Sequence, residues 1–121
     1  VKEVKEYTVD QHLKWPETKQ LYEQFEKQVL QRFEDTTVRA VKFYIAFISE
    51  ETNKSFVEIV TQKQGLKVYL RPRKEQLGES QLELTDCSSK GHWTNGNTSF
   101  NVSKPEEILP ALELIQKARN L

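Results

Sequence analysis

Apolar side chains recur at every fourth position near the start of the chain, at Leu21, Phe25, Val29 and Phe33. Positions four residues apart lie on the same side of an α-helix, and charged or amide side chains fill most of the positions between them. The pattern therefore predicts an amphipathic helix over residues 17–34 whose apolar stripe faces the core.

The segments that follow have the composition and alternation of strands. Residues 38–49 are rich in β-branched and aromatic side chains and contain neither Gly nor Pro, which predicts one long strand. Residues 55–61 and 66–70 predict two further strands, separated by a turn at Gly65. Because the connections are short, we expect an antiparallel three-strand meander. Residues 73–90 are polar and weakly patterned, and we expect an irregular loop there.

The C-terminal part predicts one more strand and a helix. Residues 99–103 have strand composition, and Ser103 stands three positions before Glu106, the spacing of a capping box. The apolar positions that follow predict a helix over 104–119. Pro110 would then remove one intrahelical hydrogen bond and kink that helix.

Together these elements predict an α+β fold: a helix, an antiparallel three-strand meander, an irregular loop, a further strand and a C-terminal helix packed on the sheet. A length of 121 residues suits one domain, which we expect over 16–121. Residues 1–15 predict a linker or arm, with its apolar side chains laid on the domain. The chain starts with Val and contains no Met, which predicts a piece of a longer protein. The predicted core residues are Phe25, Val29, Phe33, Val41, Phe43, Ile45, Phe47, Leu66, Val68, Leu70, Leu112 and Ile115.

Composition narrows the classes of function. Eighteen Lys and Arg balance eighteen Asp and Glu, so net charge gives no overall attraction to nucleic acid or to anionic lipid. The sequence has no run of about 18 apolar residues, so we expect no membrane partner. A single Cys excludes an internal disulfide framework and fits a reducing, cytoplasmic compartment. The Cys and the two His lack metal-ligand spacing, so we expect no metal and no other cofactor.

The distribution of charge is more informative than its sum. Residues 52–74 carry six cations against one acid, Glu58. Lys42 and Tyr44 extend this cationic and aromatic set if the strand register brings them to the same face. The six cations are Lys54, Lys63, Lys67, Arg71, Arg73 and Lys74.

One face of the third predicted strand combines cations with an aromatic ring. Lys67, Tyr69 and Arg71 alternate onto that face, and Arg73 follows beyond the strand. A sheet face of this kind can hold phosphates and stack bases, which predicts nucleic-acid binding. The alternative is a solvated face whose cations keep the sheet soluble.

Residues 85–97 hold the densest cluster of chemically reactive side chains. One hypothesis is an enzyme site in which His92 activates Cys87 or Ser88 while Asp86 orients the imidazole. The alternative is a structured loop in which the same polar groups cap backbone donors. The spacing resembles no established nucleophile motif, so no catalytic residue is assigned and we expect this chain to be no enzyme by itself.

Four segments resemble a known family: YTVDQHL from Tyr7, FYIAF at 43–47, VEIVTQKQGLKVYL at 57–70 and GHWTNGN at 91–97. They are similar to a bacterial domain of unknown function at the C-terminal end of longer proteins, some labelled "predicted transport protein". In many of those proteins the N-terminal part looks like a restriction-type nuclease domain. The resemblance carries over no catalytic residues. The chain departs from the usual family pattern at Thr94, at Asn97 and at Arg71, where members carry Gly, Asp and Asn respectively.

These observations predict a non-catalytic accessory domain that aids nucleic-acid or partner binding beside an upstream nuclease-like domain of the same protein. One alternative is a self-association module that forms a homo-oligomer through the arm or an exposed sheet edge. Another is the enzyme that uses the loop between Asp86 and His92. The predicted binding residues are Lys67, Tyr69, Arg71 and Arg73, followed by His92 and Asn95.

Overall fold

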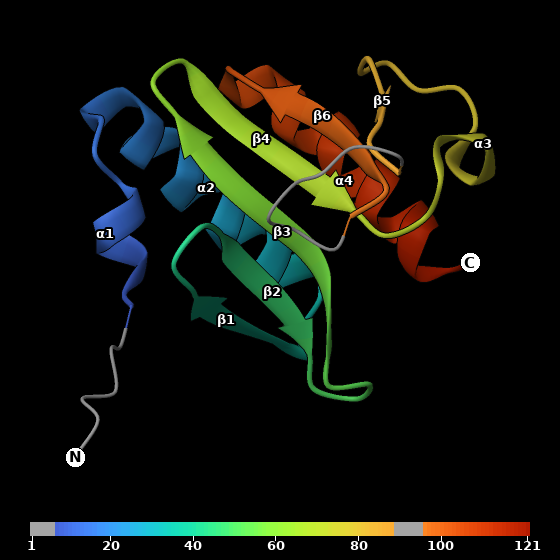
Figure 1. Ribbon diagram of the computed structural model, residues 1–121, viewed down its shortest axis with the longest axis horizontal. Coiled ribbons are helices and arrows are strands. Elements are labelled where there is room, and N and C mark those ends of the chain that lie inside the picture. Colours follow the sequence, from blue (N-terminus) through green and yellow to red (C-terminus); the bar gives the residue numbers. More distant parts are fainter. Residues whose placement is uncertain (1–6, 89–95) are drawn as a thin grey trace.

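The computed structural model describes residues 7–88 and 96–121. Six strands form one antiparallel sheet in the order β1-β2-β3-β4-β6-β5, and helices α2 and α4 lie behind it in Figure 1. The predicted α+β fold is therefore confirmed. The elements are α1 (Val9–His12), α2 (Pro16–Arg32), β1 (Thr36–Ala40), β2 (Ile45–Ser49), β3 (Lys54–Gln62), β4 (Gly65–Leu70), α3 (Lys74–Leu77), β5 (Thr85–Asp86), β6 (Thr98–Val102), the 3-10 turn η1 (Pro105–Glu107) and α4 (Ile108–Arg119).

The core lies between the sheet and the two long helices. The predicted stripe of α2 is buried, and the ring of Phe25 stacks on Phe47 of β2 with centroids 6.1 Å apart. Tyr22 lies beside the same ring at 6.5 Å. Fully burying an aromatic side chain contributes roughly 1.5–3 kcal/mol, so this aromatic cluster fixes α2 across the middle of the sheet.

The segment 38–49, predicted as one strand, is a hairpin of β1 and β2. The turn between them spans residues 41–44 and is closed by a hydrogen bond from the Val41 N–H to the Tyr44 carbonyl at 3.0 Å. The turn contains no Gly or Pro and continues the apolar alternation, so the sequence pattern hides it. The prediction that Val41 and Phe43 belong to the core was therefore wrong: Val41 is half-buried and the Phe43 side chain is 42% exposed.

Strand β3 carries one extra residue opposite β2. Ser55 and Val57 pair with successive residues of β2, which leaves Phe56 between them as a bulge. The ring of Phe56 packs edge-on against Phe33, with centroids 5.7 Å apart. The bulge thus gives β3 an aromatic contact with the end of α2 without displacing the rest of the register.

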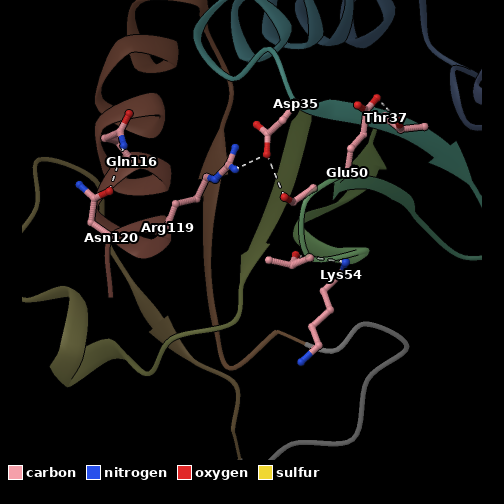
Figure 2. Close-up of polar contacts among 9 residues, drawn as sticks. Asp35, Thr37, Glu50, Lys54, Gln116, Arg119 and Asn120 are labelled. Atoms are coloured by element: carbon pink, nitrogen blue, oxygen red, sulfur yellow. Dashed lines mark hydrogen bonds and ion pairs between the residues drawn. The ribbon is translucent and has the colours of Figure 1, made fainter.

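A polar clamp joins the two long helices to the sheet (Figure 2). Arg119, in the last turn of α4, donates from Nη2 to Asp35 Oδ2 at 2.7 Å, and the Ser49 hydroxyl donates to the same oxygen at 2.9 Å. The Arg119 guanidinium also lies 4.9 Å from the Phe33 ring and 4.4 Å from the Phe56 ring. The clamp therefore holds the C-terminal end of α4 against the start of β1.

The predicted capping box before the C-terminal helix uses a different acid. Both the backbone N–H and the hydroxyl of Ser103 donate to Glu107 Oε1, at 2.8 and 2.9 Å, so the prediction of Glu106 was wrong. The predicted kink at Pro110 was also wrong. The α-helix begins only at Ile108, so Pro110 lies in its first turn, where no intrahelical donor is lost.

The segment before α2 lies on the domain. Val9 and Leu13 are partly buried and pack against the core. His12 holds the segment at two points: its Nε2 lies 2.6 Å from the Val41 carbonyl oxygen, and its own carbonyl accepts a hydrogen bond from the Thr61 hydroxyl. A carbonyl only accepts, so Nε2 carries the proton and donates. The short helix α1 is thereby fixed beside the β1–β2 turn.

Candidate functional site

Lys67, Tyr69 and Arg71 share the sheet face opposite the one packed on α2 and α4, as their alternation along β4 predicts. The Lys67 ammonium lies 5.5 Å from the centroid of the Tyr69 ring, a distance at which the ring face attracts a cation. The Tyr69 side chain is buried, whereas Lys67 is half-buried and Arg71 is exposed. The two cations therefore present this face's positive charge to solvent.

Arg71 is fixed in place by Ser55 of the neighbouring strand. Its Nε donates to the Ser55 carbonyl at 2.6 Å, and its Nη2 donates to the Ser55 hydroxyl at 2.8 Å. Two such bonds fix the guanidinium plane, while its other N–H groups keep the capacity to bind a planar or tetrahedral anion. Arg71 therefore offers donors that lose little conformational entropy on binding.

A carboxylate at the centre of this face was not singled out by sequence reasoning. Glu58 pairs directly with Tyr69 across β3 and β4 and is 2% exposed. Burial raises the pKa of Tyr44, and the adjacent Glu58 carboxylate raises it further, against the opposing effect of Arg71. The sequence feature that could have indicated it is that Glu58 is the single acid in an otherwise cationic stretch, at a strand position flanked by apolar residues.

The register of β3 and β4 places the two cations on either side of that carboxylate. Lys67 pairs with Val60, two residues beyond Glu58, and Arg71 reaches Ser55 on the other side. Within residues 7–88 and 96–121 the one ion pair joins Asp35 and Arg119, so neither Lys67 nor Arg71 is held in an ion pair there. The pairing leaves both cations available to a ligand.

Arg73 lies beyond β4 and serves a different contact. Its backbone N–H donates to the Gln76 side chain at 3.0 Å and begins α3, and its own side chain is exposed. Hydrogen bonds from Ser88 lower the pKa of the Asp86 carboxyl, and the charges of Arg73 and Lys74 lower it further. The charge of Arg73 thus stabilises the ionised Asp86 carboxyl on β5, while its side chain stays exposed to solvent.

The described part of the 85–97 cluster has the contacts of a structured turn. Asp86 Oδ1 accepts from the Ser88 N–H at 2.9 Å and from its hydroxyl at 2.6 Å, as in an Asx turn. The Cys87 thiol is buried and lies 3.1 Å from the Ser99 hydroxyl. His92 and Asn95 lie outside the described residues, so their predicted roles stay predictions.

A groove continues the cationic face beyond Arg71. It encloses about 380 Å³ between the β2–β3 turn and the end of α4. Its lining includes Lys54, Arg71 and Arg119, with Glu51 as the acid among its described residues. Asp35 balances the charge of Arg119, so Arg71 and Lys54 carry the positive charge from β4 toward the end of the sheet.

The described residues contain neither a cluster of metal ligands nor a membrane-spanning helix. No group of three or more His, Cys, Asp or Glu side chains within 7–88 and 96–121 is placed to hold a metal ion. Over the same ranges, every helix is too short or too polar to cross a membrane. The described part of this surface therefore offers cations, hydroxyls, aromatic rings and one buried carboxylate.

Comparison with known proteins places the chain in a family. It is 27% identical over 120 residues to an "Uncharacterized protein" of Haemophilus influenzae (strain ATCC 51907 / DSM 11121 / KW20 / Rd), a match that covers 98% of this chain and 39% of that protein. The chain thus spans about two fifths of the length of this relative. No solved structure matches it significantly. Residues 4–121 match the model of a family described as "Domain of unknown function (DUF5655)", and the chain belongs to that family.

Proposed function

We propose that this chain is a non-catalytic accessory domain that helps a larger cytoplasmic protein bind nucleic acid. One observation carries the proposal: Lys67 and Arg71 stand on the same sheet face, outside any ion pair in the described part of the chain, with Tyr69 between them. Phosphates are bound by Lys and Arg, and the Ser55-held guanidinium of Arg71 adds an exposed planar surface. The buried Tyr69 ring contacts the Lys67 ammonium and so helps to position it.

Such a domain is one part of a longer protein. The match to the Haemophilus relative leaves most of that protein outside the region shared with this chain. The resemblance to proteins with a restriction-type nuclease part, some labelled "predicted transport protein", supports a nuclease-like neighbour. In that arrangement the neighbour performs the chemistry, and this domain adds affinity through phosphate contacts.

Local charge drives the binding because the net charge of the chain is zero. Each phosphate contact to single-stranded nucleic acid contributes about −0.7 to the slope of log affinity against log salt. Losing Lys67 and Arg71 should therefore reduce the steepness of that slope by roughly 1–2.

The test is fluorescence anisotropy with labelled single-stranded and duplex DNA at low salt. Wild-type protein should bind, and the Lys67→Glu/Arg71→Glu variant should lose binding by at least tenfold. Lys27→Glu/Lys117→Glu is the matched control, because it changes net charge equally at two exposed positions on α2 and α4, the helices that cover the other face of the sheet. No binding by wild type at about 50 mM salt, where phosphate contacts are strong, would end the proposal. An equal loss of DNA affinity in the control variant would attribute the binding to net charge and not to Lys67 and Arg71.

One observation favours self-association as a second candidate. β1 is an edge strand, with β2 on one side and no described strand on the other. Edge strands present unpaired backbone groups that a second copy can pair with. Light scattering over a wide concentration range should show a dimer if β1 pairs between copies, and Val38→Pro should then abolish it. A monomer throughout would exclude this candidate.

A further inference from the structure

A second recessed site lies at the edge of the sheet, between α1 and the β1–β2 turn. It encloses about 190 Å³. The volume is of the size that accommodates one planar ring, since a cavity of about 150 Å³ binds benzene. Figure 1 shows α1 standing beside the sheet as a separate element. The cleft is distinct from the groove near Arg71.

Aromatic and cationic side chains from both walls line this cleft. Tyr7 and Trp15 come from the segment around α1, and Phe43 comes from the turn. Lys14 and Lys42 stand with them, and none of the described lining residues is acidic. The Lys42 ammonium lies 5.2 Å from the centroid of the Phe43 ring. Aromatic rings interleaved with cations are the usual means of holding bases and phosphates of an unpaired strand.

The two walls are tied together by His12. Its imidazole donates to the Val41 carbonyl in the turn, and its backbone carbonyl accepts from Thr61 of β3. His12 therefore has a structural role at the base of the cleft and fixes the separation of its walls. A site whose walls are already positioned loses less entropy when a ligand enters.

The cleft is continuous with the cationic face described above. Val60 lines the cleft and pairs directly with Lys67 across β3 and β4. A strand whose backbone contacts Lys67 and Arg71 thus passes beside the cleft opening.

We infer that this cleft holds an unpaired base of a single-stranded nucleic acid, packed against Trp15 and Phe43, with Lys14 and Lys42 on the adjacent phosphates. The inference rests on the proposed nucleic-acid function and deepens it by naming the strand state of the ligand. Duplex DNA keeps its bases stacked and cannot fill the cleft without unpairing. Single strands should therefore bind more tightly than duplexes of the same length.

The experiment compares two anions that differ only in their bases. Labelled oligothymidylate of about ten residues, within the usual site size, is titrated beside an abasic deoxyribose-phosphate oligomer of equal length. Wild type should bind the thymidylate about tenfold more tightly or better, since a stacked base contributes that much. Phe43→Ala should bring thymidylate affinity down to the abasic level and leave abasic affinity unchanged.

Control variants separate this inference from the proposed function. Leu109→Ala removes another exposed apolar side chain, on α4, and should change neither affinity. Lys67→Glu/Arg71→Glu should weaken both oligomers. The chain has two tryptophans, Trp15 and Trp93, so Trp93→Phe leaves Trp15 as the single indole fluorophore. In that background, thymidylate should quench the fluorescence of Trp15 and the abasic oligomer should not. Equal wild-type affinity for both oligomers would overturn the base cleft while nucleic-acid binding stands, and binding of neither would overturn both.

Discussion

Arg119 at the end of α4 donates a 2.7 Å hydrogen bond to Asp35 between α2 and β1, across 84 positions of sequence. The guanidinium also faces the rings of Phe33 and Phe56. One side chain thus joins α4, the C-terminal end of α2 and the bulge of β3. Arg119 packs on Phe56 in the bulge, and the neighbouring Ser55 binds the Arg71 guanidinium. The clamp therefore helps to position Arg71 in the candidate site.

The Asp35 clamp predicts a pH-dependent stability. Hydrogen bonds from Arg119 and Ser49 lower the pKa of Asp35 from its ordinary 3.8. Stabilisation by a carboxylate with a lowered pKa is present above about pH 4 and is lost as pH falls through the lowered value. Asp35→Asn should lower the urea midpoint at pH 7, and its difference from wild type should shrink toward pH 3. Glu34→Gln, at the exposed neighbour, should show no such convergence.

The capping contact predicts different outcomes for two adjacent acids. Glu107→Ala removes the acceptor of both Ser103 hydrogen bonds and should cost about 0.5–1 kcal/mol of unfolding free energy, at the low end for an exposed cap. Glu106→Ala should change stability by less than about 0.5 kcal/mol, as surface substitutions usually do. Urea titration of both variants measures the difference. Equal losses would contradict the assigned cap.

Gly96 predicts a steric cost. A Cβ atom added there would lie 2.6 Å from the Tyr69 Cβ and 3.1 Å from the Leu70 carbonyl oxygen, closer than such atoms normally approach. Gly96→Ala should therefore destabilise the protein by about 1–3 kcal/mol and weaken oligonucleotide binding through Tyr69. Gln81→Ala, at an exposed position before β5, is the control. Unchanged thermal stability of Gly96→Ala would show that β4 shifts enough to accommodate the added methyl group.

Cys87 predicts a protected thiol. The side chain is 4% exposed and hydrogen bonds to the Ser99 hydroxyl. An aromatic disulfide reagent should therefore modify the native protein slowly and the urea-unfolded protein at once. Cys87→Ala should leave oligonucleotide affinity unchanged, as should Ser88→Ala. Rapid stoichiometric labelling of the folded protein would instead favour the hypothesis of a nucleophile in this loop.

Elements with strong local patterns could be predicted from the sequence. The period of four in α2 and the alternation of β4 each have one face to bury, so position alone assigns a side chain to core or solvent. The same reasoning correctly placed Lys67, Tyr69 and Arg71 on one face. It missed β5, because a two-residue strand has no period, and it missed the turn at 41–44, because tertiary packing and not Gly or Pro makes that turn.

The features that give this protein a candidate site are relations between distant residues. Alternation within β4 determined that two cations share a face, but only the register of β3 could place Glu58 between them. Only the fold could bring Trp15 and Phe43 to the same cleft, and Ser55 beside Arg71. The physical reason is that local sequence sets backbone preference and side-chain direction over a few residues. Pairing between separated segments depends on the shared burial of the whole core.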